Sequence, residues 1–252
     1  MSNWFTLTRR EVGSFFYSII AYVVFVVFAL LVGWDISSQL KYALGFSSEL
    51  ASYGIPLRLF GGGLPLILLL LITPMITMRL LAEERKSGTL ETLMTAPVTD
   101  VEVVLSKFTA GWIVYLALWV PSLVLLLLVS QWPGDLEVGP IFSGLFGIAC
   151  LGAVFVSAGL FASSLTSNQI VAAILGTVIN FVLFLVPVYS IQARLFAGSE
   201  TADRIFSHMD ISAHLQDFGR GLIDTSTVVY YVSLTGFFLF LTVRSLEARK
   251  WS

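Results

Sequence analysis

Long apolar stretches without a single charged residue dominate the pattern of this chain. The shortest of the five contains 19 residues and the longest 56. A helix needs about 20 apolar residues to cross a bilayer, because each residue advances it by about 1.5 Å. Four stretches therefore hold one helix each and the longest holds two, which predicts six membrane spans. The stretches lie between Glu11 and Asp35, Arg58 and Arg79, Lys107 and Asp135, Glu137 and Arg194, and Asp224 and Arg244.

The longest stretch is interrupted near its middle by a polar cluster at residues 163–169. Polar residues there allow the backbone to meet water, so the cluster predicts a tight turn between the fourth and fifth spans. We expect an all-α polytopic membrane protein whose residues 1–252 form a single transmembrane domain. The predicted spans cover residues 15–33, 64–81, 108–129, 141–162, 170–189 and 228–243, separated by two long external segments, 35–63 and 190–227, and a cytoplasmic segment, 82–106.

The distribution of Lys and Arg orients the predicted helices. Nine of the fourteen fall on the side that holds both termini, and five fall on the other side. Short cytoplasmic loops carry the positive excess in membrane proteins. The pattern therefore predicts a multi-pass protein of the cell inner (cytoplasmic) membrane with both termini in the cytoplasm.

Composition excludes several classes of function. Hydrophobic residues make up 57% of the chain and charged residues 12%, and the net charge is -2. Such a chain is not a soluble globule, and it lacks the basic excess that binds nucleic acid. The predicted spans contain no acid or base for intramembrane catalysis or ion coupling, and no charged ring for a channel filter.

The segment ahead of the first span has an apolar face. Trp4, Leu7, Thr8 and Val12 fall near one side of a helix. Such a helix can lie in the headgroup layer with its basic residues toward the inner leaflet. The alternative is a plain cytoplasmic extension of the first span, and the sequence favours neither.

The cytoplasmic segment 83–102 predicts two short helices. Ser87 can cap the first, which carries an apolar stripe of Leu90, Leu93 and Met94 and ends before Pro97. Thr99 and Glu102 form a capping box for a second helix that continues into the third span. Periodicity alone favours an ordinary solvated amphipathic hairpin here.

A resemblance adds a function to this segment. The residues ERKSGTLETL at 84–93, followed by APV at 96–98, resemble the signature between the second and third spans of ABC-2 type transporter permeases. The stretch HLQDFGRGLID at 214–224 and the basic end EARKW at 247–251 are similar to the gliding-motility-like subgroup of that family. The resemblance covers essentially the whole chain.

The resemblance implies a permease subunit of an exporter that is driven by two cytoplasmic ATP-binding subunits. The chain has no Gly-x4-Gly-Lys loop, so we expect no cofactor in it, with ATP and Mg bound by the partner. A second permease copy or a related permease would complete the transporter within the membrane lipid, and the cytoplasmic helix would dock on the ATPase as a coupling helix. The residues assigned to this coupling are Glu83, Glu84, Arg85, Ser87, Gly88, Thr89, Leu90, Glu91, Leu93, Met94 and Pro97.

Other features leave alternatives open. Ala172, Gly176, Thr177 and Asn180 form a small and polar face on the fifth span, which suits packing within the chain, a dimer seam or a transport path. His208 and His214 lie near carboxylates in the second external segment, but their spacing matches no compact metal motif. Apolar residues between 206 and 222 predict short external helices that dip into the outer leaflet. A membrane anchor or assembly scaffold that transports nothing is the alternative function.

Prolines in the predicted spans suggest bends. Each removes a backbone donor from a helix interior and can kink it. They are Pro65 and Pro74 in the second span, Pro121 in the third and Pro187 in the fifth.

Overall fold

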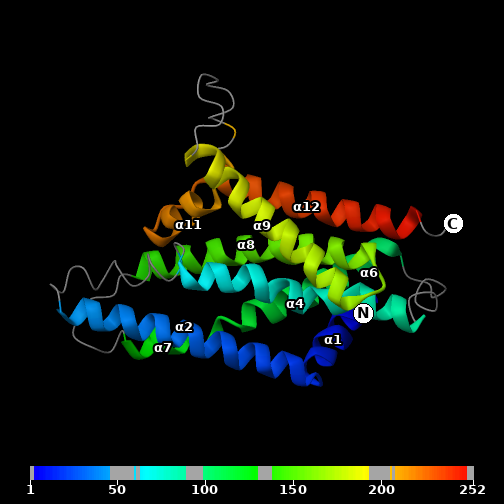
Figure 1. Ribbon diagram of the computed structural model, residues 1–252, viewed down its shortest axis with the longest axis horizontal. Helices are drawn as coiled ribbons and strands as arrows, with labels where there is room; N and C mark the ends of the chain where they lie inside the picture. The colour runs from blue at the N-terminus through cyan, green and yellow to red at the C-terminus, as the bar shows by residue number, and fades with distance from the viewer. Residues whose placement is uncertain are drawn as a thin grey trace.

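The chain folds into a bundle of long helices (Figure 1). The computed structural model describes residues 3–45, 60, 63–88, 99–129, 138–192, 205 and 208–248, and these residues include no strand. This confirms the all-helical prediction. The helices are α1 (Asn3–Phe16), α2 (Ile19–Gly45), α4 (Leu64–Ser87), α6 (Asp100–Ala117), α7 (Val120–Val129), α8 (Val138–Leu165), α9 (Gln169–Gln192), α11 (Ile211–Gly219) and α12 (Thr225–Glu247).

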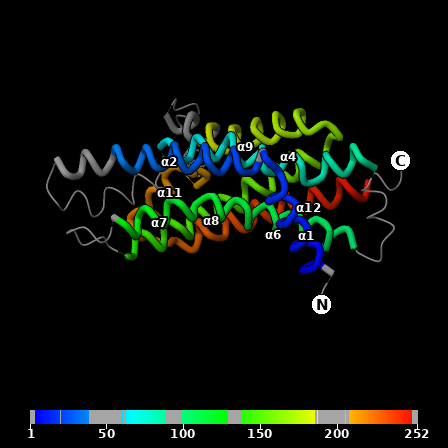
Figure 2. The backbone as a smooth tube through the Cα atoms, turned by 90° about the horizontal axis from the view of Figure 1, so that it is seen from below, coloured from blue at the N-terminus to red at the C-terminus, as the bar shows by residue number. Residues whose placement is uncertain are grey.

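Helix α8 lies at the centre of the bundle and packs against α4, α6, α9, α11 and α12 (Figures 1 and 2). Its middle is rich in small residues, and a Cβ added at Gly152 would overlap the ring of Tyr115. Small residues let helix backbones approach closely, which is how helices in a membrane gain packing energy. As a result, nearly every residue of α8 from Leu151 to Leu160 is buried, on all sides of the helix.

Within the part of the chain that the structure describes, five helical segments are long and apolar enough to cross a membrane. They lie in α2, α4, α6 with α7, α8 and α12. The remaining expected span, the fifth along the chain, corresponds to α9, whose described apolar part, Gln169–Leu185, is shorter. Large apolar side chains are exposed along the outer faces of the bundle, as in Leu30, Ile174 and Val232. Such surfaces suit lipid rather than water, and they support an integral membrane protein.

The first predicted span begins later than its hydrophobic pattern indicates. Helix α1 ends at Phe16 and α2 begins at Ile19, after a turn in which the Ser18 amide donates to the Phe15 carbonyl at 3.1 Å. Helix α1 is therefore a separate helix rather than a straight extension of the first span. It packs against α6, which buries Thr8 and Phe15.

Several local predictions are confirmed. The turn between α8 and α9 falls at residues 166–168, where the Asn168 side chain accepts from the Ile170 amide at 2.9 Å. The capping box is present, because Thr99 accepts from the Glu102 amide while the Glu102 carboxylate accepts from the Thr99 amide. Both features follow from side chains that satisfy the unpaired amides of a first helical turn.

The four prolines occupy different positions relative to their helices, and only some of these positions favour a bend. Helical structure is interrupted at residues 118–119 just before Pro121, as expected for a proline bend. Pro74 and Pro187 lie inside α4 and α9. The suggested bend at Pro65 is wrong, because Pro65 occupies the first turn of α4, where the missing amide has no helical partner.

Different helical segments form the two ends of the bundle. Helix α1, the last turns of α4 and α12, and the α8–α9 turn lie at one end, whereas α11 lies toward the other (Figures 1 and 2). Charged side chains such as Arg79, Glu84 and Lys107 belong to the first end.

Candidate functional site

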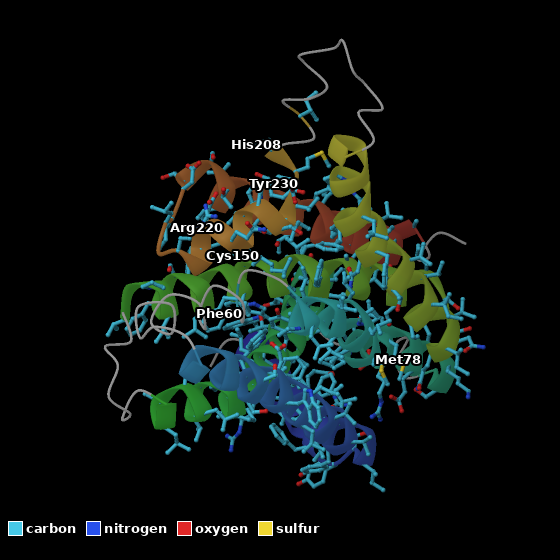
Figure 3. The ribbon with its side chains drawn as sticks, turned by 60° about the vertical axis from the view of Figure 1, so that its left-hand side comes forward. Phe60, Met78, Cys150, His208, Arg220 and Tyr230 are labelled. Atoms are coloured by element: carbon cyan, nitrogen blue, oxygen red, sulfur yellow. The ribbon has the colours of Figure 1, made fainter. Side chains whose placement is uncertain are left out.

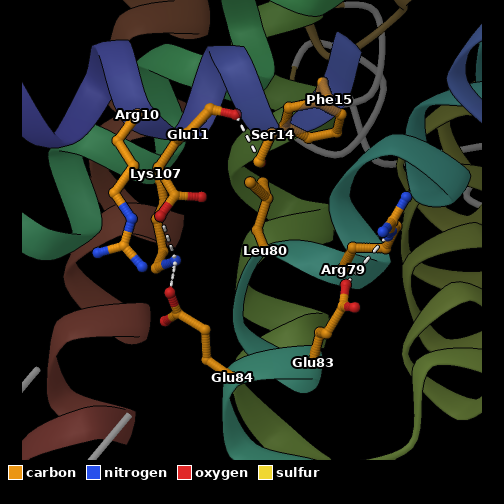
Figure 4. A pocket seen from close by; sticks show the side chains of 9 residues that line it. All are labelled: Arg10, Glu11, Ser14, Phe15, Arg79, Leu80, Glu83, Glu84 and Lys107. Carbon is orange, nitrogen blue, oxygen red and sulfur yellow. Dashed lines mark hydrogen bonds and ion pairs between the residues drawn. The ribbon is translucent and has the colours of Figure 1, made fainter. Parts of the chain in front are cut away.

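A buried lysine joins three helices at the end of the bundle that holds α1. Lys107, two turns into α6, is 1% exposed. Its ammonium nitrogen lies 2.7 Å from a carboxylate oxygen of Glu84 on α4 and 3.1 Å from one of Glu11 on α1. Figure 4 shows the lysine between these two carboxylates. A buried ammonium is tolerated only when it is paired, so the two carboxylates stabilise its position.

A second ion pair fixes the neighbouring turn of α4. Arg79 pairs with Glu83, one turn further along the same helix, at 3.0 Å. The guanidinium also donates to the Ser18 hydroxyl in the turn between α1 and α2. Two basic side chains therefore tie α4 to the N-terminal helices, Lys107 through Glu11 and Arg79 through Ser18.

These groups line a cavity of about 210 Å³ beside α1 (Figure 4). Its charged side chains are balanced in sign, so it has no strong preference for an anion or a cation. Its lining consists of Arg10, Glu11, Ser14, Phe15, Arg79, Leu80, Glu83, Glu84 and Lys107.

The end of α4 shows where part of the predicted coupling segment begins. Ser87 lies in the last turn of α4, and its hydroxyl donates to the carbonyls of Glu83 and Glu84 at 3.0 and 3.2 Å. The helix that Ser87 is predicted to cap lies outside the described residues, so that capping stays a prediction. Gly88 terminates the helix with φ +72, and its amide bonds to the Arg85 carbonyl at 3.3 Å. Glycine reaches this left-handed conformation without strain, which gives Gly88 a backbone role at the end of α4.

The rest of the predicted coupling segment falls outside the described residues. Glu83, Glu84, Arg85, Ser87 and Gly88 are described. Their assignment to contacts with an ATPase stays a prediction, and the contacts given above lie within this chain. The assigned residues that lie outside the described part are Thr89, Leu90, Glu91, Leu93, Met94 and Pro97.

Sequence reasoning missed Lys107 as a functional candidate. It marks the start of an uncharged stretch, so it was counted as a boundary charge. A signal was present, because the capping box at Thr99 sets the start of the helix and so places Lys107 two turns inside it, on an otherwise apolar segment. A charge in that position needs a buried partner.

The small and polar face of α9 is directed at the chain's own helices. A Cβ added at Gly176 would lie 3.3 Å from Pro74 of α4 and 3.5 Å from the Gly159 backbone of α8. Ala172 and Asn180 are buried on the same side, and Thr177 bonds back to Ala173 at 2.8 Å. Within the described residues, both amide atoms of Asn180 are buried without a hydrogen-bond partner. The contacts described here are intrachain packing, and roles in a transport path or a dimer seam stay predictions.

Both histidines lie beside Tyr230 of α12, and Figure 3 shows His208 near it. His214, on α11, is 6% exposed and its ring centroid is 5.7 Å from those of Tyr230 and Tyr231. Burial lowers the pKa of His214, and the charge of His208 lowers it further, while Asp210, Asp217 and Asp224 act in the opposite direction. Among the described residues, no three His, Cys, Asp or Glu side chains are arranged to hold a metal ion.

The apolar residues within helix α11 pack inside the bundle, whereas Leu222, which follows the helix, is 59% exposed, and contact of this region with the outer leaflet stays a prediction. Leu215 and Phe218 are buried in the bundle, and the Phe218 carbonyl accepts from the Ser143 hydroxyl of α8 at 2.6 Å. Asp210 caps the helix by accepting from the amides of Ser212 and Ala213. Packing on α8 satisfies this face of α11 without the outer leaflet.

The chain matches the sequence model of a known protein family. The sequence model of the family described as ABC-2 family transporter protein matches residues 39–243. A search of curated proteins found no match. The matched range contains Glu84 and Lys107, and it begins after α1.

Proposed function

The chain belongs to the ABC-2 family of transporter proteins, and from this membership we propose that it is an exporter in which the conformational change driven by the ATPase reaches the membrane helices through the Lys107 site. Membership makes it a membrane permease subunit of an ABC transporter, the transmembrane component rather than the ATPase. Subunits of this family act with ATP-binding subunits. The outward direction of transport and the mode of coupling are parts of the proposal, as is the gliding-motility-like subgroup.

The proposed complex contains two cytoplasmic ATP-binding subunits and two permeases. The second permease is either another copy of this chain or a related one, since closed two-fold pairing is the commonest symmetry of such assemblies. ATP and Mg bind in the partner subunits. Membrane lipid covers the outer apolar faces of the bundle.

The proposed topology has six spans, formed by the five segments given above and by α9, which is the fifth of the six along the chain. The α8–α9 turn lies at the same end of the bundle as α1 and the end of α12, which supports two antiparallel crossings in between. The excess of Lys and Arg at that end supports a cytoplasmic position for it, in the inner membrane.

The observation that carries the coupling proposal is the contact of Lys107 with both Glu84 and Glu11. Glu84 lies in the last turn of α4, directly before the segment that resembles a coupling helix. Lys107 lies near the start of α6, directly after that segment. A force on residues 89–98 therefore acts on α4, α6 and α1 together rather than on a single helix end.

Within the coupling segment we assign docking on the ATPase to the apolar stripe of Leu90, Leu93 and Met94. A buried apolar anchor surrounded by polar contacts is the usual arrangement of a strong interface. Glu91 and the charged end of α4 supply the polar contacts. Gly88 ends α4, and its backbone conformation sets the direction of the chain that carries the apolar stripe.

The test is purification of the complex from its native membrane in mild detergent, followed by an ATPase assay. We expect an ATP-binding subunit to co-purify with the wild type and to be lost with Leu90→Asp. Leu222→Asp is the matched control, because Leu222 is 59% exposed near the other end of the bundle. Retention of the ATPase by Leu90→Asp would refute the docking assignment. Recovery of the wild type without any ATPase would favour a membrane anchor or scaffold.

The topology has its own test. A cysteine placed at Lys86 and one placed at Asp217, both exposed positions, are labelled in a Cys150→Ala background with a membrane-impermeant maleimide. In intact cells we expect labelling at position 217, and at position 86 only after the membrane is opened. The reverse pattern would refute the proposed orientation.

A further inference from the structure

The hydroxyl of Ser163, at the end of α8, is bonded to the backbone of α4. Its oxygen accepts from the amides of Leu81 and Ala82 at 3.2 and 3.0 Å, and it donates to the Met78 carbonyl at 3.0 Å. Ser163 is fully buried. A serine hydroxyl has one proton and two lone pairs. All three are used here on a single turn of the neighbouring helix.

The bonded groups are the ones that hold that turn of α4 together. In a regular α-helix the carbonyl of residue 78 pairs with the amide of residue 82. The Ser163 oxygen lies within hydrogen-bond distance of both. A side chain inserted into the backbone hydrogen bonds is one of the recognised causes of helix bending. The turn from Met78 to Ala82 is therefore a point at which α4 can bend while its backbone groups remain paired.

Close packing surrounds this turn and keeps water out. One turn earlier on α8, a Cβ added at Gly159 would overlap the Thr77 hydroxyl of α4. Leu81 and Ala82 are fully buried. Water cannot replace the Ser163 hydroxyl in such a place, so its loss would leave the Met78 carbonyl and the Leu81 and Ala82 amides with only the hydrogen bonds that α4 itself supplies.

The turn lies directly before the coupling site. Glu83 and Glu84 follow Ala82 in α4, and Glu84 holds Lys107. On the other helix, Ser163 lies just before the turn that leads into α9. The neighbouring Ser164 carbonyl accepts from Ser245 of α12 at 3.4 Å. The contact therefore connects the end of α4 with three further helices.

We propose that Ser163 is a positioning residue for transport, which transmits movement of the α4 end to the α8–α9 turn. The proposal rests on the proposed function, because that movement begins at the coupling segment. The last turns of α4 bend at Met78–Ala82, and the hydroxyl of Ser163 moves with them. Without it, α4 bends alone and the α8–α9 turn stays in place.

The test measures amide hydrogen exchange in the complete complex, with its ATP-binding subunits, in the absence and presence of MgATP and vanadate. The variant is Ser163→Ala. Ser164→Ala is the matched control, because Ser164 is equally buried and its hydroxyl donates to Phe161 within its own helix. Ser163→Thr keeps the hydroxyl and tests for rescue.

We expect the Leu81 and Ala82 amides to exchange about tenfold faster in Ser163→Ala than in Ser164→Ala. We also expect the nucleotide-dependent change in exchange to persist in α4 but to disappear from residues 163–170, and Ser163→Thr to restore it. Equal co-purification of the ATPase shows that each variant is folded.

Two results would overturn the proposal, and they differ in cause. A nucleotide response at residues 163–170 that survives Ser163→Ala would refute the role of Ser163 while leaving the proposed function intact. Absence of any nucleotide response in the wild-type α4 would refute the proposed function, and the role of Ser163 with it.

Discussion

Removal of the Lys107 charge tests the energetics of the coupling site. In Lys107→Met the side chain keeps a similar length and loses its ammonium. At an effective dielectric constant of about 20, the attraction is about 6 kcal/mol for the Glu84 contact at 2.7 Å and about 5 kcal/mol for the Glu11 contact at 3.1 Å. Desolvation of the three charges offsets much of this attraction.

The carboxylates decide the net cost. Glu11 and Glu84 are 15% and 18% exposed, so both stay largely buried when the ammonium is removed. Breaking a buried ion pair on one side costs about 3–5 kcal/mol, and the partial access to water places this site near the lower value. About 3 kcal/mol corresponds to a fall of about 6–12 °C in Tm for a chain of this size.

Thermal unfolding of the purified protein in detergent measures this fall. The control is Lys86→Met, which removes a charge from an exposed position close by in the chain and is expected to shift Tm by less than about 2 °C. Combining Lys107→Met with Glu11→Gln and Glu84→Gln should recover most of the loss, since the two carboxylates that face the ammonium are then neutral as well. A Tm for Lys107→Met equal to that of the control, or no recovery in the triple variant, would refute the reasoning.

Three further predictions concern single positions. Gly88→Ala should cost about 1 kcal/mol, because residue 88 has φ +72, and Gly88→Asn less; the order of Tm values checks this, and equal values for the two would contradict it. Burial favours the neutral form of His214, so its pKa in the folded protein lies below its ordinary value. As the pH falls, the histidine is therefore protonated first in the unfolded state, and the stability of the fold should decrease below about pH 6.5. The drop in Tm between pH 7.5 and 5.5 should therefore be smaller in His214→Gln than in the wild type. Gly176→Val should lower Tm by several degrees, because its side chain would press on Pro74, whereas Gly236→Val, where a Cβ meets open space, should change it little.

The sequence predicted those parts of the fold that depend on local pattern. The uncharged stretches located the long helices, since a charge inside a bilayer is costly. The turn near Asn168 and the capping box at Thr99 also follow from nearby residues. A separate N-terminal helix was one of the two interpretations of the sequence, but the break between α1 and α2 falls a few residues later than the predicted start of the first span, because residues 17 and 18 do not interrupt the apolar pattern.

The contacts that make the candidate site depend on which helices meet and in which register, and one sequence does not contain that information. Glu11 and Lys107 are 96 residues apart in the chain. Ser163 is 81 residues from Ala82. Ser163 and Ser164 are adjacent and have the same residue type, yet one bonds to another helix and the other to its own. Packing decides this difference.

The position of Glu11 has a practical consequence for expression of the protein. The family match begins at residue 39, so a fragment trimmed to the recognised domain would lack α1 and keep Lys107. Such a fragment would also lose most of α2, and it would retain a lysine whose second counter-charge had been removed, so it would misassemble for reasons unrelated to its transport role. Affinity tags are therefore better placed after α12, and any shortened version should retain residue 11.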